Sequence, residues 1–309
     1  MTPTGNWSPR AAEVSADRTP RTAPETGRFS FSDLRGWGAD DLDGALAAFR
    51  QAPDDPLTDA ARNAPDGRTF FETYFAPGPA SVGHFTGYYE PELDGSLTQS
   101  AAFPVPVHGL PDAGCTHPRA GIDAHLTGQE IVWLRDAVDR FFLQVQGSGR
   151  VRLPDGTTLR LGYAGRNGHP YRSIGKLLIE RGDFNTDITA DALKAWLRAD
   201  PERGRALMEE NPSYVFFAPL DAPSDQGPRG TLCPVTAGRS LAVDPDRTPL
   251  GTPIWIEVDG MARLCIAQDT GSAIKGPGRG DLFFGTGDAA GQAAGRLNHV
   301  GSFRALVRR

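Results

Sequence analysis

The sequence predicts a mainly β protein made of small β-barrels with short helices, on three observations. Glycine (37) and proline (26) together make up about a fifth of the 309 residues, which favours many turns and short strands over a helical bundle. From about residue 230 onward, strand patterns dominate. The expected strands and helices do not alternate regularly, which argues against a wound parallel sheet.

The N-terminal third begins with a polar stretch, residues 1–28, which is rich in Pro, Thr and Ala. We expect it to be a disordered leader, because it offers too little apolar surface to fold. Short helices are expected at about 40–50 and 57–65. The aromatic stretch HFTGYYEPEL, residues 84–93, is expected to form a strand.

A further helix is expected to begin near Thr127, because Thr127 and Glu130 have the spacing of a capping box. Ile131, Leu134 and Val138 follow three and four residues apart, as on one helix face. The next two stretches have the composition of strands, with Pro-Asp-Gly as a turn in the second: FFLQVQG (141–147) and VRLPDGTTLRLGY (151–163).

Three helices are predicted next, in YRSIGKLLIERGD (171–183), TADALKAWLRA (189–199) and PERGRALMEEN (201–211). The first is expected to end at Gly182. For the third, Asp200 is a suitable N-cap and Pro201 suits the first helical position.

The C-terminal region is expected to consist mainly of strands, interrupted by a helix at 288–297. Asp259-Gly260 joins two apolar runs by a two-residue loop, which is a strong hairpin signal. The predicted strands are RSLAVD (239–244), TPIWIEV (252–258), ARLCIAQ (262–268) and SFRALV (302–307).

Charge and cysteine spacing exclude several classes of function. The net charge of −6 argues against sequence-independent nucleic-acid binding, which needs a basic face. The cysteines form no C-x-x-C pair and the histidines no H-x-x-x-H pair, so we expect no metal site. Cys233 and Cys265 would pair in an oxidising compartment, but small apolar packing residues are the favoured interpretation, also for Cys115.

Cellular location is left open by the residues themselves. No apolar run approaches the roughly 18 residues of a membrane span. Residues 1–28 lack the apolar segment of a signal peptide, so this chain shows no export signal. Either the protein is cytoplasmic or a signal was removed before residue 1.

Asp269-Thr270-Gly271-Ser272 has the letters of an aspartic protease motif. Such an enzyme needs two carboxylates that share one proton, at a separation of about 3 Å. The chain contains the motif once, and a symmetric dimer of such small protomers does not suit its length. The protease is therefore the least favoured hypothesis.

Three carboxylates, Asp244, Asp269 and Asp281, lie in glycine-rich turns at strand ends. Each alone fits an Asx-turn, in which the side chain bonds its own backbone. Three such aspartates in one β-rich unit favour a catalytic role over three separate Asx-turns. Asp281 precedes the apolar stretch 282–284, so burial would raise its pKa and make it a usable general acid near neutral pH.

Two sets of motifs resemble a known family. LAVDPDRTPLGTPIWIEV (241–258) and AQDTGSAIKGPGRGDLFFGTG (267–287) resemble the 3D module, named for three aspartates that correspond here to Asp244, Asp269 and Asp281. The rest resembles the lytic murein transglycosylases of the MltA type, and the likeness runs from about residue 85 to 309. Its motifs are FTGYYEPEL (85–93), LQVQGSG (143–149), YAGRNGHPYRSIGKLLIERG (163–182) and NPSYVFF (211–217).

The resemblance implies a discontinuous double-psi β-barrel domain, residues 29–95 plus 221–309, that carries the 3D module. A second, smaller β-barrel domain, residues 96–220, is inserted into it, and glycan binds in the groove between the two. We expect a monomer without metal or cofactor that acts on peptidoglycan glycan strands. The resemblance also implies a periplasmic location, with outer-membrane association and partners in cell-wall synthesis or hydrolysis complexes left open.

The implied reaction is cleavage of the β-1,4 bond between N-acetylmuramic acid and N-acetylglucosamine, with a 1,6-anhydro end as product. The resemblance makes Asp281 the single acid and then base, Asp269 a supporting residue and Asp244 a structural one. The spacing of twelve residues from Asp269 to Asp281 is one longer than is common, and Ser272 replaces a frequent glycine.

Substrate contacts are expected from Thr86, Tyr88 and Tyr89, because tyrosines offer flat faces and hydroxyls to sugars. The remaining expected contacts are Gln146, Ser148 and Lys275. Each has an ordinary structural alternative, such as a core tyrosine or a solvated lysine. A non-catalytic glycan-binding module remains the alternative function.

Overall fold

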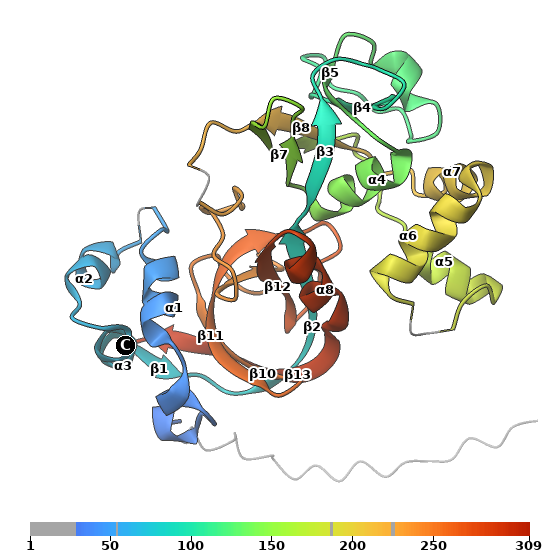
Figure 1. Ribbon diagram of the computed structural model, residues 1–309. Helices are drawn as coiled ribbons and strands as arrows, with labels where there is room; N and C mark the ends of the chain where they lie inside the picture. Colours follow the sequence, from blue (N-terminus) through green and yellow to red (C-terminus); the bar gives the residue numbers. More distant parts are fainter. Residues whose placement is uncertain (1–28, 54, 186–187, 224–225) are drawn as a thin grey trace, which may run out of the picture.

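The computed structural model describes residues 29–53, 55–185, 188–223 and 226–309, and two β-sheets form its framework (Figure 1). The predicted leader lies outside the described residues. In the part of the chain that is described, no helix has both the length and the apolar character needed to span a membrane. The mainly β prediction is confirmed.

The first sheet contains a closed six-stranded barrel. Its strand order is β13–β10–β11–β9–β12–β2, and β2 pairs back onto β13. The pairs β9–β11 and β2–β12 are parallel, and the others are antiparallel. The strands are β2 (Ser81–Glu90), β9 (Ser240–Val243), β10 (Pro253–Val258), β11 (Met261–Thr270), β12 (Arg279–Thr286) and β13 (Asn298–Arg308), and β1 (Phe75–Pro77) adds to β13. The barrel is filled by apolar side chains such as Phe85, Leu241, Ile254 and Leu282.

Short N-terminal helices cover one side of the barrel (Figure 1). They are the 3₁₀ turns Phe31–Asp33 and Trp37–Ala39 and the helices α1 (Leu42–Phe49), α2 (Thr58–Asn63) and α3 (Gly67–Tyr74). Phe49 and Phe70 pack with Trp255 of β10 in one apolar cluster. The helix α3 was not predicted, because its residues contain few of the strong helix formers.

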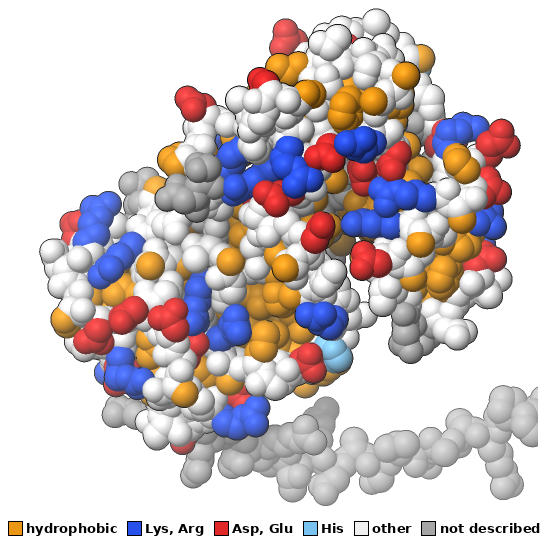
Figure 2. All heavy atoms as spheres, in the orientation of Figure 1, with side chains coloured by type: hydrophobic (Ala, Val, Ile, Leu, Met, Phe, Trp, Pro, Cys, Tyr) orange, Lys and Arg blue, Asp and Glu red, His pale blue; other side chains and the backbone are white. Residues whose placement is uncertain are grey.

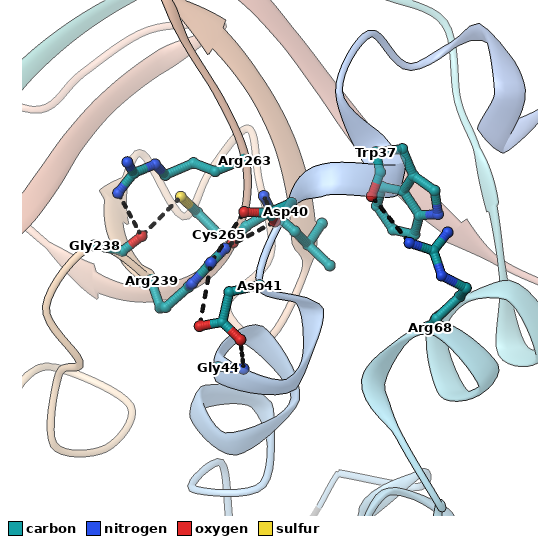
Figure 3. A network of polar contacts seen from close by, with 10 residues as sticks. Trp37, Asp40, Asp41, Gly44, Arg68, Gly238, Arg239, Arg263 and Cys265 are labelled. Carbon is teal, nitrogen blue, oxygen red and sulfur yellow. Dashed lines mark hydrogen bonds and ion pairs between the residues drawn. The ribbon is translucent and has the colours of Figure 1, made fainter.

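A buried ion pair joins this N-terminal segment to the barrel, as Figure 3 shows. The guanidinium of Arg239 donates to both carboxylate oxygens of Asp40, at 2.9 and 3.0 Å. The backbone N–H of Leu264 in β11 donates to Asp40 as well, at 2.9 Å. Both carboxylate oxygens of Asp40 therefore accept hydrogen bonds from donors within the protein.

The second sheet has the order β4–β5–β3–β6–β7–β8. Its strands are β3 (Glu92–Ser96), β4 (Val105–His108), β5 (Glu130–Leu134), β6 (Gly149–Arg152), β7 (Thr158–Arg166) and β8 (Val215–Pro219). In the described residues no ladder joins β4 to β8, so closure of this sheet into a second barrel stays a prediction. A 3₁₀ turn, Ile122–His125, lies between β4 and β5.

Four helices accompany the second sheet and share an apolar cluster of their own (Figure 1). They are α4 (Ala137–Gln146), α5 (Ile174–Arg181), α6 (Ala190–Ala199) and α7 (Pro201–Glu209). The predicted caps are confirmed: Gly182 ends α5 at a φ of 80°, and Asp200 accepts from the Arg203 N–H at the start of α7. The last helix, α8 (Asp288–Arg296), lies over β2 and β12 of the barrel.

The stretch from 127 to 147 was predicted wrongly. Residues Glu130–Leu134 form strand β5 rather than a helix, and FFLQVQG lies in α4 rather than in a strand. The three-and-four spacing of apolar residues had run across the junction between the two elements. The true N-cap is Asp136, whose carboxylate accepts from the Asp139 N–H at 2.7 Å.

The predicted strand 84–93 is two strands that belong to different sheets. The chain leaves the barrel at Glu90, passes Pro91 and enters the second sheet as β3. Proline offers no N–H to a ladder, which explains the break. The expected domain boundaries at 95/96 and 220/221 stay predictions, and β3 runs across the first of them.

Other C-terminal predictions are confirmed. Asp259 and Gly260 have positive φ angles of 48° and 76°, as a tight hairpin turn between β10 and β11 requires. All three cysteines are free thiols, and Cys233 and Cys265 are buried as small packing residues. Strand β12 was not predicted as a strand, because its glycines resemble a turn.

Candidate active site

Parallel pairing of β12 with β2 brings Asp281 opposite Thr86. The Thr86 hydroxyl donates a hydrogen bond to Oδ1 of Asp281. Arg279 lies two residues earlier on β12, and its Nη2 donates to the same Thr86 hydroxyl at 2.8 Å. Its Nη1 donates to the carbonyls of His84 and Gly280. The three side chains form a chain of hydrogen bonds that ends on the Asp281 carboxyl.

The environment of Asp281 favours its protonated form. Burial raises the pKa of Asp281 to about 6, and the negative charge of Asp269 acts in the same direction. The Thr86 hydrogen bond and the positive charge of Arg279 oppose this rise in the pKa only in part. The next two residues, Leu282 and Phe283, are buried in the protein, as the sequence suggested. The carboxyl can therefore exchange a proton near neutral pH.

Asp269, at the end of β11, is held by donors on both oxygens. Oδ1 accepts from the Thr231 N–H at 2.9 Å, the Thr231 hydroxyl at 3.0 Å and the Thr270 N–H at 2.8 Å. Oδ2 accepts from the Tyr88 hydroxyl at 2.9 Å. Burial raises the pKa of Asp269, and these hydrogen bonds counteract the rise. The carboxylate is thus an acceptor that orients its neighbours.

Tyr88 of β2 contacts both Asp269 and the strand β12 that carries Asp281. Its ring packs against Phe283 of β12, with centroids 5.1 Å apart. Burial raises the pKa of Tyr88 well above 10, and the charges of Asp269 and Asp281 raise it further. The hydroxyl therefore keeps its proton and donates it in a hydrogen bond to Asp269.

Asp244 anchors the loop between β11 and β12. Its carboxylate accepts from the Gly276 N–H at 2.8 Å and from Lys275 Nζ at 3.2 Å. The Gly276 hydrogen bond is the main cause of the lowered pKa of Asp244, with Lys275 as a further contribution. Lys275, expected to contact substrate, is thus engaged in holding this loop.

The other expected contact residues lie at the junction of the two sheets. The Tyr89 N–H donates to Oε1 of Gln146 in α4 at 3.1 Å, and Lys194 Nζ lies 3.4 Å from the Tyr89 hydroxyl. Ser148 is buried between α4 and β6. Within the described residues, neither Gln146 nor Ser148 hydrogen-bonds to the Asp281 or Asp269 carboxyl.

Sequence reasoning missed Arg279, Thr231 and Glu90. Glu90 is fully buried at the junction, where its Oε2 accepts from Arg150 Nε at 2.7 Å and the Thr286 hydroxyl at 2.8 Å. Arg279 could have been found, because residues two apart on a strand share a face. Thr231 offers no such signal, since it reaches Asp269 from a distant loop.

A cavity of about 380 Å³ lies between the second sheet and the barrel loop that follows β11. Its lining residues include Arg166, His169 and Tyr171 on one side and Ser272 and Ala273 on the other. Figure 2 shows a recess between the barrel and the lobe formed by α5–α7, with lysine and arginine side chains along its upper edge. The junction of the two sheets is thus concave, as ligand sites usually are.

Comparisons with known proteins agree with these motifs. A model of the MltA-specific insert domain matches residues 84–118 and 115–218, and a model of the 3D domain matches residues 239–307. The membrane-bound lytic murein transglycosylase A of Vibrio cholerae is 40% identical over 235 residues, covering 70% of this chain. The chain spans 63% of the length of that curated relative.

Solved structures extend the likeness over most of the chain. The membrane-bound lytic murein transglycosylase of Agrobacterium tumefaciens is 31% identical with a TM-score of 0.81, covering 91% of this chain and 97% of that one. The Escherichia coli MltA with bound chitohexaose is 28% identical with a TM-score of 0.74, covering 92% of each chain. With the shared insert and 3D domains, the chain belongs to the MltA family of lytic transglycosylases.

Proposed function

We propose that this protein is a peptidoglycan lytic transglycosylase. It cleaves the β-1,4 bond between N-acetylmuramic acid and N-acetylglucosamine and leaves a 1,6-anhydro-N-acetylmuramic acid end. The observation that carries the proposal is the partly buried carboxyl of Asp281, which has a pKa of about 6. The bound chitohexaose of the E. coli relative, a β-1,4-linked chain of N-acetyl sugars, supports the substrate class.

The hydrogen bonds indicate which oxygen of Asp281 carries the acid proton. A guanidinium can only donate, so the Thr86 hydroxyl accepts from Arg279 and directs its own proton to Oδ1 of Asp281. Oδ2 has no hydrogen-bond partner among the described residues. The proton on Oδ2 is therefore available for the glycosidic oxygen, which leaves as O4 of N-acetylglucosamine.

The second step uses the same carboxylate as a base. The C6 hydroxyl of N-acetylmuramic acid attacks C1, and Asp281 accepts the proton of that hydroxyl. One proton is given and one is taken back, so the residue returns to its starting state. The product is the 1,6-anhydro sugar, and water is not consumed.

The surroundings of Asp281 do not suit a hydrolase or a protease. A glycoside hydrolase needs a second carboxylate to activate water or to attack the sugar. Asp269 has both oxygens occupied by protein donors, and Glu90 is fully buried against Arg150. An aspartic protease would need Asp269 to share a proton with a second carboxyl, whereas Asp269 accepts from Tyr88 instead.

Several finer assignments belong to the same proposal. Thr86 and Tyr88 act by positioning the two carboxyls, and Tyr89 with Gln146 lines the junction that receives the glycan. Asp244 and Lys275 hold the loop between the two aspartate strands. We further propose the double-psi topology for the closed barrel, and action as a monomer in the periplasm or at the outer membrane.

The products of digestion test the proposal. Purified sacculi are incubated with the wild-type protein and with Asp281→Asn, and the released fragments are analysed by mass spectrometry. We expect 1,6-anhydro-muropeptides from the wild type and almost none from the variant. Reducing-end products from the wild type would indicate a hydrolase, and binding without any product would indicate a glycan-binding module.

A further inference from the structure

Of the residues that the structure describes, the cavity between the two sheets is lined by one arginine and one histidine and by no acidic one. Arg166, at the end of β7, is exposed, and its side chain makes no hydrogen bond or ion pair with the described residues. Two nearby arginines, in contrast, have an acidic partner: Arg172 and Arg181 both form ion pairs with Glu210. In a chain of net charge −6, an unpaired cation in a cavity favours an anionic ligand.

The wall that carries Arg166 is held in place by a buried amide. Nδ2 of Asn167 donates to the carbonyls of His117 and Pro212 at 2.7 and 2.8 Å, and its Oδ1 accepts from the Tyr214 N–H at 2.9 Å. The ring of His169 is fixed too, because its Nε2 lies 2.8 Å from the Thr116 carbonyl. A carbonyl only accepts, so Nε2 carries a hydrogen, and Nδ1 of the neutral ring is left as an acceptor for a hydroxyl or N–H group of a ligand.

The opposite wall belongs to the loop that connects the two aspartate strands. Ile274 is buried, and Gly276 is tied to Asp244, so the loop is anchored just beyond the cavity. Ser272 and Ala273, which line the cavity, are exposed. Ser272 lies three residues after Asp269. A ligand in the cavity would thus touch the same loop that connects the strands of Asp269 and Asp281.

We propose that this cavity binds a carboxylate carried on the lactyl side of N-acetylmuramic acid, with Arg166 as its main partner and His169 beside it. This inference rests on the proposed function. The sugar rings of the glycan are neutral, so the negative charge comes from the peptide stem or, in strands without stems, from the lactyl group itself. Arg166 would then give the protein a higher affinity for a muramic acid unit than for an N-acetylglucosamine unit, which has no carboxylate.

Binding without turnover tests this site. Soluble ligands are titrated calorimetrically into the full chain carrying Asp281→Asn, with or without Arg166→Gln. The ligands are glycan fragments with peptide stems, the same fragments after an amidase has removed the stems, and chitohexaose, which has no carboxylate. We expect Arg166→Gln to weaken binding of the stem-bearing fragments by roughly five- to tenfold, as loss of one charge-assisted contact does. Chitohexaose binding should not change, and Arg166→Lys should restore part of the loss.

The three ligands separate the possible results. Weakening for stem-bearing fragments alone assigns the stem carboxylate, and weakening for both muramic acid ligands shows that the site accepts the stem carboxylate or, once the stem is removed, the free lactyl carboxylate. Equal weakening for chitohexaose, or no weakening at all, overturns the proposal. The control Arg62→Gln, an exposed arginine on α2 paired with Asp59, should leave all three affinities unchanged. If wild-type protein releases no anhydro product while the binding difference persists, the proposed reaction is wrong and the binding site remains.

Discussion

Asp40 and Asp281 are carboxylic acids that both contact the same barrel, but the groups that donate hydrogen bonds to them differ. Both oxygens of Asp40 accept from the guanidinium of Arg239, and a backbone N–H is added. Asp281 accepts from the hydroxyl of Thr86, while the neighbouring Arg279 donates to that hydroxyl and to backbone carbonyls.

The difference explains how one barrel can hold a structural acid together with Asp281, the acid that we propose to be reactive. The bidentate guanidinium of Arg239 occupies both oxygens of Asp40 and makes this side chain part of the packing. Burial with a neutral donor disfavours the ionised form, and the pKa of Asp281 rises to about 6. The comparison predicts opposite results for the two aspartates in activity and in stability.

The largest effect is expected on the rate of glycan cleavage. Asp281→Asn removes the transferable proton and should lower kcat by about 10²- to 10⁴-fold, the usual size of general acid–base catalysis. Asp40→Asn should leave kcat per folded molecule within a few fold. Initial rates of anhydro-product release, corrected for the folded fraction, measure both. A similar loss in the two variants would break the comparison.

Stability should respond in the opposite order. Asp40→Asn removes the buried partner of Arg239 and leaves it, among the described residues, only the exposed Asp41 as an acidic partner, at 3.6 Å. Breaking a buried pair in this way typically costs about 3–5 kcal/mol in the free energy of unfolding. Urea unfolding monitored by tryptophan fluorescence measures this change. The control Asp59→Asn breaks an exposed pair with Arg62 and should cost less than about 1 kcal/mol. If the Asp40→Asn protein is as stable as the wild type, the structural role assigned to the Asp40–Arg239 pair is wrong.

Asp281→Asn should stabilise the protein at neutral pH. The folded pKa of Asp281 is raised, so its ionised form is disfavoured in the folded state. The stability contribution of the protonated acid is present below its ordinary pKa and is lost as the pH rises through about 6. Above that pH, the neutral asparagine should raise the free energy of unfolding by about 1–3 kcal/mol. Melting temperatures at pH 4 and pH 8 test the sign, and a gain at pH 4 alone would contradict it.

The smallest effect concerns the pH dependence of the rate. The acid must be protonated at the start, so the wild-type rate should fall as the pH rises through about 6. Arg279 lowers the pKa of Asp281, so Arg279→Gln should move this falling limb to higher pH. The change in rate at pH 7 should be less than about tenfold. Arg62→Gln is the matched control, and a limb displaced to lower pH would refute the assigned role of Arg279.

Local pattern predicted those elements whose signals lie within a few residues. Asp200 and Pro201 mark the start of α7, and Asp259-Gly260 marks a hairpin, because caps and tight turns depend on neighbouring backbone groups. The pattern failed between residues 127 and 147, where apolar spacing ran across a strand and the following helix. There the sheet, by pairing β5 with β4 and β3, overrode local preference.

The sequence by itself determined which residue types were available for chemistry and where the acid Asp281 meets apolar neighbours. Only the tertiary structure decided that Thr86 donates to that acid and in turn accepts from Arg279. It also decided that Tyr88 and Thr231 donate to Asp269, and that Arg239 pairs with Asp40. The physical reason is distance along the chain. Thr86 and Asp281 lie 195 residues apart and meet because β2 and β12 pair in parallel within a closed barrel, which no local pattern specifies.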